Sequence, residues 1–461
     1  MNGFLSNDEL VALRLRKFEL HFLQMRIEQL TSEGQAFSGS GVIKQTTEGK
    51  LQFTLYAKEA LPFEKIIKGI SGMAGVQVGQ IIPEHVFYRL TATDLSGREW
   101  TSTHLYPIIN TVQGGSLCTG ELREIVQENS LQVPIKHEHL YLEIHDKIEI
   151  PCNTWSATMK TVAGQELNSS SLNVLRFDAS GYEITIQKES DALQIRTLAK
   201  GARLEEYFEV RIIEALQFVV ARPVFWSVMQ KWTSEGWKIC IRPSRPNELQ
   251  PRIGTPLSNT PDSAESFCRM FENYLQYILT GNTGEKMHPI SAQMHAICRA
   301  STGSIEAQAL TLSVAIESIL KYVHDSKYEL SQEKRNWIEK AKSYFASWEG
   351  PNDLSERITG LLSMLHTSSA SIRLRELVEL KVIADSQEQA WRKIRHKFAH
   401  GEALGSLSRQ EFLDLTNTEL VLFYQLVFYA IGYRGKYTDY SLPGWPTKEY
   451  SAPTRNVSGS D

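Results

Sequence analysis

Apolar and polar residues alternate along the first half of the chain. From about residue 39 to residue 199 they form short runs separated by turn residues; Leu51, Phe53 and Leu55, for example, alternate with polar side chains after a glycine turn. A period of two places the apolar side chains on one face of a β-strand. Repeated hairpins of this kind predict a β-rich domain over residues 1–245, built as a sandwich-like or a curled antiparallel sheet.

Both ends of this domain have a different pattern. The first thirty residues are ambiguous, because Phe18, Leu20 and Phe22 alternate as in a strand within a stretch that also suits a helix. The spacing of apolar residues over 203–220 predicts a helix that closes the domain.

Prolines mark the end of the β-rich region. Five of them fall within nineteen residues, interleaved with serine, asparagine and glycine: Pro243, Pro246, Pro251, Pro256 and Pro261. Proline at this density continues neither a helix nor a central strand. We therefore predict a linker at 246–262.

After the linker, the apolar period changes to 3.6, which predicts an all-α bundle over residues 263–436. The clearest helix covers 304–323. The last begins with Ser408 and Glu411 in capping-box spacing and becomes apolar on every side from Leu420 to Ile431. Such a helix must be covered, either by its own bundle or by a second subunit. Residues 437–461, with three further prolines, are predicted to be irregular, and the whole chain is predicted to be α+β.

Composition and charge exclude several classes of protein and of binding site. The 461 residues carry a formal net charge of -4, from 49 basic and 53 acidic residues, which excludes a strongly basic polyanion-binding surface. Five widely spaced cysteines favour a reducing compartment over a disulfide framework or a zinc ribbon. The chain begins without a signal-peptide pattern, and its longest apolar run is too short for a bilayer. We expect a cytoplasmic protein with no membrane partner and no cofactor.

One candidate metal cluster lies in the β-rich domain. His137, His139, Glu143 and His145 occupy alternate positions of a predicted strand and so share a face on which they could converge on a metal ion. Their spacing matches part of a cupin motif, but the bracketing glycines and the second motif are missing. A solvated polar strand face is the favoured interpretation.

Basic and histidine side chains concentrate near residue 395. The segment from Trp391 to Gly401 includes Arg392, Arg395, His396, Lys397 and His400 on a helix expected to start near Ser386. Cations followed by a glycine also suit an ordinary helix C-terminus. Metal binding by the two histidines lacks a third ligand nearby, so no metal site is predicted.

Arg395 and His400, with a polar residue directly after the arginine, resemble the Arg-x4-6-His motif of HEPN-domain ribonucleases. The β-rich domain before a helical domain containing RHKFAHG is similar to the ApeA-like anti-phage defence proteins. The resemblance implies a metal-independent endoribonuclease that acts in abortive-infection defence. It also implies a homodimer whose two motifs face each other, and an N-terminal domain that recognises a phage-derived trigger.

The chemistry fits the residues that the resemblance indicates. Histidine exchanges protons near neutral pH, as attack of a ribose 2′-OH on the adjacent phosphate requires, and arginine is a permanent planar cation suited to phosphate. Five residues separate Arg395 from His400, so they lie about 140° apart on an ideal helix, and one motif alone makes a poor pocket. Lys397 and Arg392 are predicted to bind flanking RNA phosphates, although each taken singly suits a solvated basic face better. His396 and Glu317 are predicted to support the site; Glu317 would orient an arginine or histidine, and the alternative is an exposed helix carboxylate. The alternative is a non-catalytic HEPN-like module for dimerisation or for binding RNA or protein.

Overall fold

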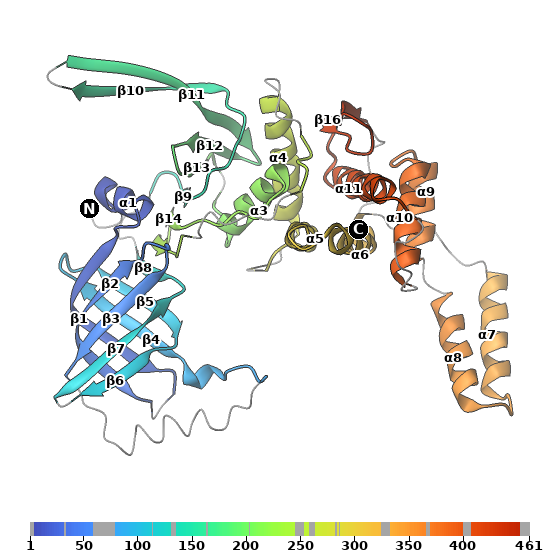
Figure 1. Ribbon diagram of the computed structural model, residues 1–461, viewed down its shortest axis with the longest axis horizontal. Coiled ribbons are helices and arrows are strands. Elements are labelled where there is room, and N and C mark those ends of the chain that lie inside the picture. Colours follow the sequence, from blue (N-terminus) through green and yellow to red (C-terminus); the bar gives the residue numbers. More distant parts are fainter. Residues whose placement is uncertain are drawn as a thin grey trace. The chain divides into compact units, whose positions relative to one another are not determined.

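The computed structural model describes residues 4–451, apart from 32–33, 59–78, 113, 131–134, 163–164, 202, 245–252, 258–262, 282–283, 285, 324–331, 366–368 and 400–406. The chain forms two compact units, one of residues 1–216 and 224–249, the other of residues 217–223 and 250–461. The first is mainly strands and the second mainly helices (Figure 1). The predicted α+β class is confirmed.

The first unit contains one antiparallel sheet, rather than two stacked sheets. Fifteen strands of its described residues hydrogen-bond in the order β10-β11-β12-β13-β9-β14-β15-β8-β5-β4-β1-β2-β3-β7-β6. Their bounds are β1 (Glu19–Gln29), β2 (Ala36–Gln45), β3 (Leu51–Ala57), β4 (Tyr88–Asp94), β5 (Glu99–Leu105), β6 (Ile108–Val112), β7 (Gly115–Leu122), β8 (Ile125–Ser130), β9 (His139–Ile144), β10 (Thr154–Val162), β11 (Gln165–Ala179), β12 (Tyr182–Lys188), β13 (Leu193–Ala199), β14 (Val228–Trp232) and β15 (Gly236–Ile241).

The strands from β1 to β8 curl around an apolar core (Figure 1). Phe22, Phe37, Phe53 and Trp100 are almost completely buried there, as the period-two alternation predicts. Gly39 allows β2 to lie close against β3, because a Cβ atom at this position would lie 1.9 Å from a backbone oxygen of the neighbouring strand.

The ambiguous first thirty residues contain both a helix and a strand. Helix α1 (Asn7–Arg14) begins with a complete capping box, in which Ser6 and Glu9 exchange side-chain and backbone hydrogen bonds. The chain then enters β1. The helix predicted at 203–220 is shorter at its start, since α3 spans Phe208–Val220.

The second unit is a helical bundle with a small hairpin. Its helices, besides the end of α3, are α4 (Ser263–Thr280), α5 (Pro289–Ala300), α6 (Ile305–Val323), α7 (Gln332–Ala346), α8 (Asn352–Met364), α9 (Ala370–Glu379), α10 (Asp385–Ala399) and α11 (Arg409–Ile431). Among the described helices, none combines the length and the apolar composition needed to cross a membrane.

The chain itself covers the apolar helix α11. Every residue from Leu420 to Ile431 is buried, and α4, α6 and α10 contact this helix. Phe428 also packs against Tyr437 and Tyr450. The sequence left open whether this helix is buried by its own bundle or by a second subunit. It is buried by the bundle of the same chain, so its apolar surface is no evidence for a second subunit.

The prediction of an irregular tail is wrong for its first part. Strands β16 (Gly435–Thr438) and β17 (Thr447–Tyr450) form an antiparallel hairpin, and Gln425 Nε2 donates to Tyr437 Oη at 3.0 Å. The prolines Pro443 and Pro446, which suggested irregular structure, lie in the connection between the two strands. Within the predicted linker, the described residues 253–257 also pack on the helical unit, where Tyr424 Oη donates to the Gly254 carbonyl at 2.6 Å.

Candidate functional site

Helix α10 carries the basic motif. It begins at Asp385, one residue before the expected start. Its buried residues include Trp391 and Ile394, and Ile394 packs against Ala309 of α6 and Phe412 of α11. These contacts fix the helix between two others, so that its polar side has a defined direction.

The polar side of α10 borders a cleft within the helical unit. The cleft has a volume of about 400 Å³ and is formed by α6, the start of α9 and α10. The residues that line it are Glu317, Ser369, Ala370, Ser371, Trp391, Arg392, Arg395 and His396. Four residues predicted from the sequence therefore meet at one cleft, namely Arg395, His396, Glu317 and Arg392.

Glu317 binds Arg395 directly. The Arg395 Nε–H donates to Glu317 Oε1, and the two side chains remain 40% and 34% exposed. An ion pair this open to water stabilises a fold by only about 1 kcal/mol or less. The guanidinium is thus oriented by the carboxylate while a ligand can still reach it.

Arg392 is held by a second carboxylate. Its Nη2 donates to Glu388 Oε1 one turn earlier on α10, and the Glu388 side chain is buried whereas Arg392 is about half exposed. Residues four positions apart on a helix are neighbours, so this ion pair could have been predicted from the sequence. We did not predict Glu388 as part of the site.

One predicted residue of the described part of the chain does not line the cleft. Lys397 is half-buried and is not among the described residues that line it. His400 lies outside the described residues. Its proposed role rests on the sequence motif.

Trp391, which lines the cleft, is held in place by residues that were not predicted from the sequence. Trp391 Nε1 donates to the Ser313 carbonyl at 3.3 Å, and Ser313 Oγ donates to Glu419 Oε1 at 2.6 Å. Burial raises the pKa of Glu419 well above its ordinary value, although the bond from Ser313 opposes this. The burial of this carboxyl therefore favours its neutral form over its charged form.

The first residues of α9 and its cap also line the cleft. Ser369 caps the helix, its side chain accepting from the Ile372 N–H, and Ala370 and Ser371 form the first turn. Helix N-termini attract anions. Together with Arg392 and Arg395, this terminus makes the cleft suited to phosphate oxygens.

The cluster at 137–145 is neither a metal site nor a solvated strand face. Glu143 is fully buried and accepts from Arg14 Nε at 2.7 Å and Arg14 Nη2 at 2.8 Å. His145 Nε2 lies 2.8 Å from the same carboxylate, while His139 stacks on Trp232 at a centroid distance of 4.4 Å. Only His137 is exposed. No group of three or more metal-ligating side chains occurs among the described residues.

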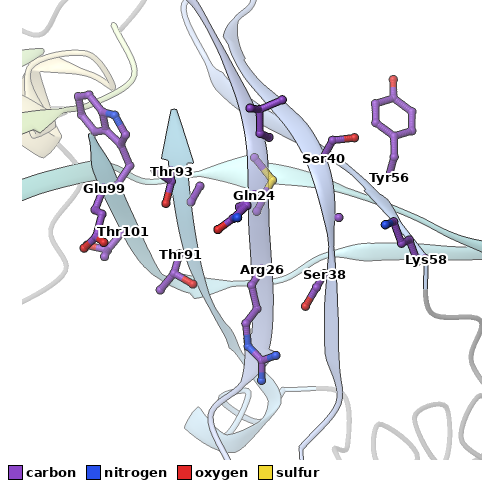
Figure 2. A pocket seen from close by; sticks show the side chains of 15 residues that line it. Gln24, Arg26, Ser38, Ser40, Tyr56, Lys58, Thr91, Thr93, Glu99 and Thr101 are labelled. Carbon is purple, nitrogen blue, oxygen red and sulfur yellow. The ribbon is translucent and has the colours of Figure 1, made fainter. Parts of the chain in front are cut away.

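A larger hollow of about 820 Å³ lies on the N-terminal sheet. Figure 2 shows its polar lining, which comes from strands β1 to β5 and the residue after β3. Its charged residues are Arg26, Lys58 and Glu99, and Arg26 is also bound by Glu28 at 3.2 Å. With both signs of charge and mainly hydroxyl and amide groups, this surface favours no single class of ligand.

Comparisons of the chain with protein-family models, with curated proteins and with solved structures give no match. The functional assignment therefore depends on the residues themselves and their geometry.

Proposed function

We propose that the chain is a metal-independent endoribonuclease of the HEPN type whose site is the α10 cleft. The observation that carries the proposal is the grouping of Arg395, Arg392 and His396 with the start of α9 around one exposed hollow. A cleft with two guanidinium groups beside a helix N-terminus suits an RNA phosphate and its neighbour.

The proposed reaction needs no group beyond the protein and RNA. The ribose 2′-oxygen attacks the adjacent phosphorus and loses its proton, the bond to the 5′-oxygen breaks, and that oxygen takes up a proton. The products are a 2′,3′-cyclic phosphate and a 5′-hydroxyl. Arg395, oriented by Glu317, would stabilise the charge on the phosphate oxygens. His400 would transfer protons, as the sequence motif implies.

The motif spacing favours a homodimer, since positions five residues apart lie about 140° apart around an ideal helix. In a dimer, the arginine of one subunit could serve with the histidine of the other. The resemblance to ApeA-like proteins further suggests a role in anti-phage abortive infection, with the N-terminal unit recognising a phage-derived trigger in the cytoplasm.

A cleavage assay tests the proposal. Purified full-length protein is incubated with a mixed RNA substrate, with and without a chelator, and compared with Arg395→Ala and with Arg357→Ala, which removes an exposed arginine of α8. We expect cleavage by the parent and by Arg357→Ala, unaffected by the chelator, and a loss of about 100-fold or more for Arg395→Ala. Equal activity of Arg395→Ala would overturn the assignment.

The second candidate is a helical module that binds RNA or protein without cutting. The observation that favours it is that carboxylates already engage both arginines of the cleft. If the parent binds RNA but yields no products, alone or with extract of phage-infected cells, and Arg395→Ala binds more weakly, this second function is supported.

A further inference from the structure

A second hollow of the N-terminal unit has features of a ligand site. It has a volume of about 620 Å³ and lies between the N-terminal segment with α1 and the strands β9 and β11 to β14. This volume falls within the range of roughly 300–1,000 Å³ that is usual for small-molecule sites. Three arginines and one glutamate supply its charges: Arg14, Arg176, Arg196 and Glu183.

The strand register places two of these arginines on the same face. Arg176 of β11 lies opposite Thr185 of β12, which lies opposite Arg196 of β13. Cross-strand partners share a face of the sheet. Two strand spacings separate the arginine backbones by about 10 Å, so the long side chains can reach one diphosphate group from both sides.

Charges elsewhere in this hollow are already compensated. Glu143 binds Arg14 with both oxygens. Lys200 lies 3.0 Å from Glu183 and 2.9 Å from Asp178. Lys200, the two acids Glu183 and Asp178, and the two arginines Arg176 and Arg196 together carry a net charge of +1.

Arg176 and Arg196 have no such compensation. Neither forms an ion pair with any carboxylate in the part of the chain that the structure describes. Among the described residues, the Arg196 guanidinium donates to the neutral Gln194 side chain, at 3.3 Å. Both side chains are exposed to the hollow and to water.

An aromatic column forms another wall. His139 stacks on Trp232 at 4.4 Å, and Phe4 stacks on Trp232 at 4.4 Å with the rings inclined by 27°. Phe4 remains 58% exposed although it lines the hollow. An exposed aromatic face beside uncompensated arginines suits a ligand with a flat ring at one end and an anion at the other.

We propose that this hollow binds a small nucleoside phosphate, with Arg176 and Arg196 on the phosphate oxygens and Phe4 stacked on the base. Thr185, between the two arginines, supplies a hydroxyl to the same oxygens. The site is independent of RNA cleavage and of the α10 cleft.

Isothermal titration calorimetry of the full-length chain tests this site, with ADP, inorganic pyrophosphate and adenosine as probes. We expect saturable binding of ADP, weaker binding of pyrophosphate and still weaker binding of adenosine. The double variant Arg176→Ala/Arg196→Ala should lower ADP affinity by at least about tenfold. Phe4→Ala should weaken ADP but leave pyrophosphate unchanged. The matched control, Arg26→Ala/Arg89→Ala, removes two exposed arginines of β1 and β4 and should bind ADP like the parent.

Three results would overturn the proposal. One is that neither ADP nor pyrophosphate binds at millimolar concentration. Another is that the double variant and the control lose affinity equally, which would indicate general charge attraction. The third is that a single-stranded oligonucleotide binds at these arginines while ADP does not. Thermal unfolding of each variant confirms that the fold is retained, and all of these readouts are independent of nuclease activity.

Discussion

Glu143 gives a sharp test of how the N-terminal unit is held together. The carboxylate is fully buried and joins helix α1 to strand β9 through Arg14, while Tyr141 and His145 also bind it. Burial alone would raise the pKa of Glu143, but the hydrogen bonds from Arg14, His145 and Tyr141 outweigh it and lower the pKa to about 2. We predict that Glu143→Gln is strongly destabilising.

The pKa shift sets the size and the pH dependence of the effect. A fall from an ordinary 4.5 to about 2 corresponds to about 3 kcal/mol of unfolding free energy. Because the folded pKa lies below the unfolded pKa, this contribution is complete above pH 4.5 and is lost as the pH falls from 4.5 towards 2. Removing one partner of a buried pair costs a similar amount, about 3–5 kcal/mol.

The assay is urea unfolding followed by tryptophan fluorescence, at pH 7 and at steps down to pH 3. Glu143→Gln should lower the free energy of unfolding by about 3 kcal/mol at pH 7, and its difference from the parent should shrink as the pH falls. The control is Glu149→Gln, which removes a 56% exposed glutamate paired with Lys188 and should cost less than about 1 kcal/mol. Equal effects of the two substitutions, or a difference that persists undiminished at pH 3, would refute the reasoning.

Three further predictions concern the helical unit. Glu317→Gln should reduce RNA cleavage about tenfold or more by releasing Arg395, yet change the free energy of unfolding by less than about 1 kcal/mol because the pair is exposed; a large loss of stability with unchanged cleavage would contradict this. Glu419→Gln should gain thermal stability relative to the parent as the pH rises from 5 to 8, because the raised folded pKa of Glu419 means that the parent loses stability above the unfolded pKa. An unchanged difference in melting temperature across that range would count against a raised pKa of Glu419. Ser408→Ala should cost about 1 kcal/mol in urea unfolding by removing the cap of α11, and a neutral effect would show that the tertiary contacts of α11 compensate.

Much of the fold could be read from local periodicity. Alternation such as that of Leu51, Phe53 and Leu55 reports the buried face of a strand directly, and the 3.6-residue period of 304–323 reports the buried stripe of a helix. The β16–β17 hairpin was missed because four-residue strands give no measurable period, and the prolines of the connection dominate the pattern.

The site was only partly readable, for a different reason. Arg392, Arg395 and His396 lie within one helical segment, so their shared face follows from spacing alone. Contacts between distant segments do not follow from spacing. Glu317, 78 residues from Arg395, was predicted to orient the site from its place beside the apolar stripe of its helix. The start of α9 was not predicted, because it joins the cleft only through the packing of the bundle. Likewise, the alternation of 137–145 identified a shared face, but Arg14, which neutralises Glu143, comes from another element 129 residues away.

The most direct test of the central claim is to map the ends of RNA fragments made by the parent protein. Attack by the 2′-oxygen at the α10 cleft predicts fragments with a 2′,3′-cyclic phosphate and a 5′-hydroxyl, formed by the parent and by Arg357→Ala and absent with Arg395→Ala or His400→Ala. Fragments that end in a 3′-hydroxyl and a 5′-phosphate, or the same fragments from Arg395→Ala, would contradict the account.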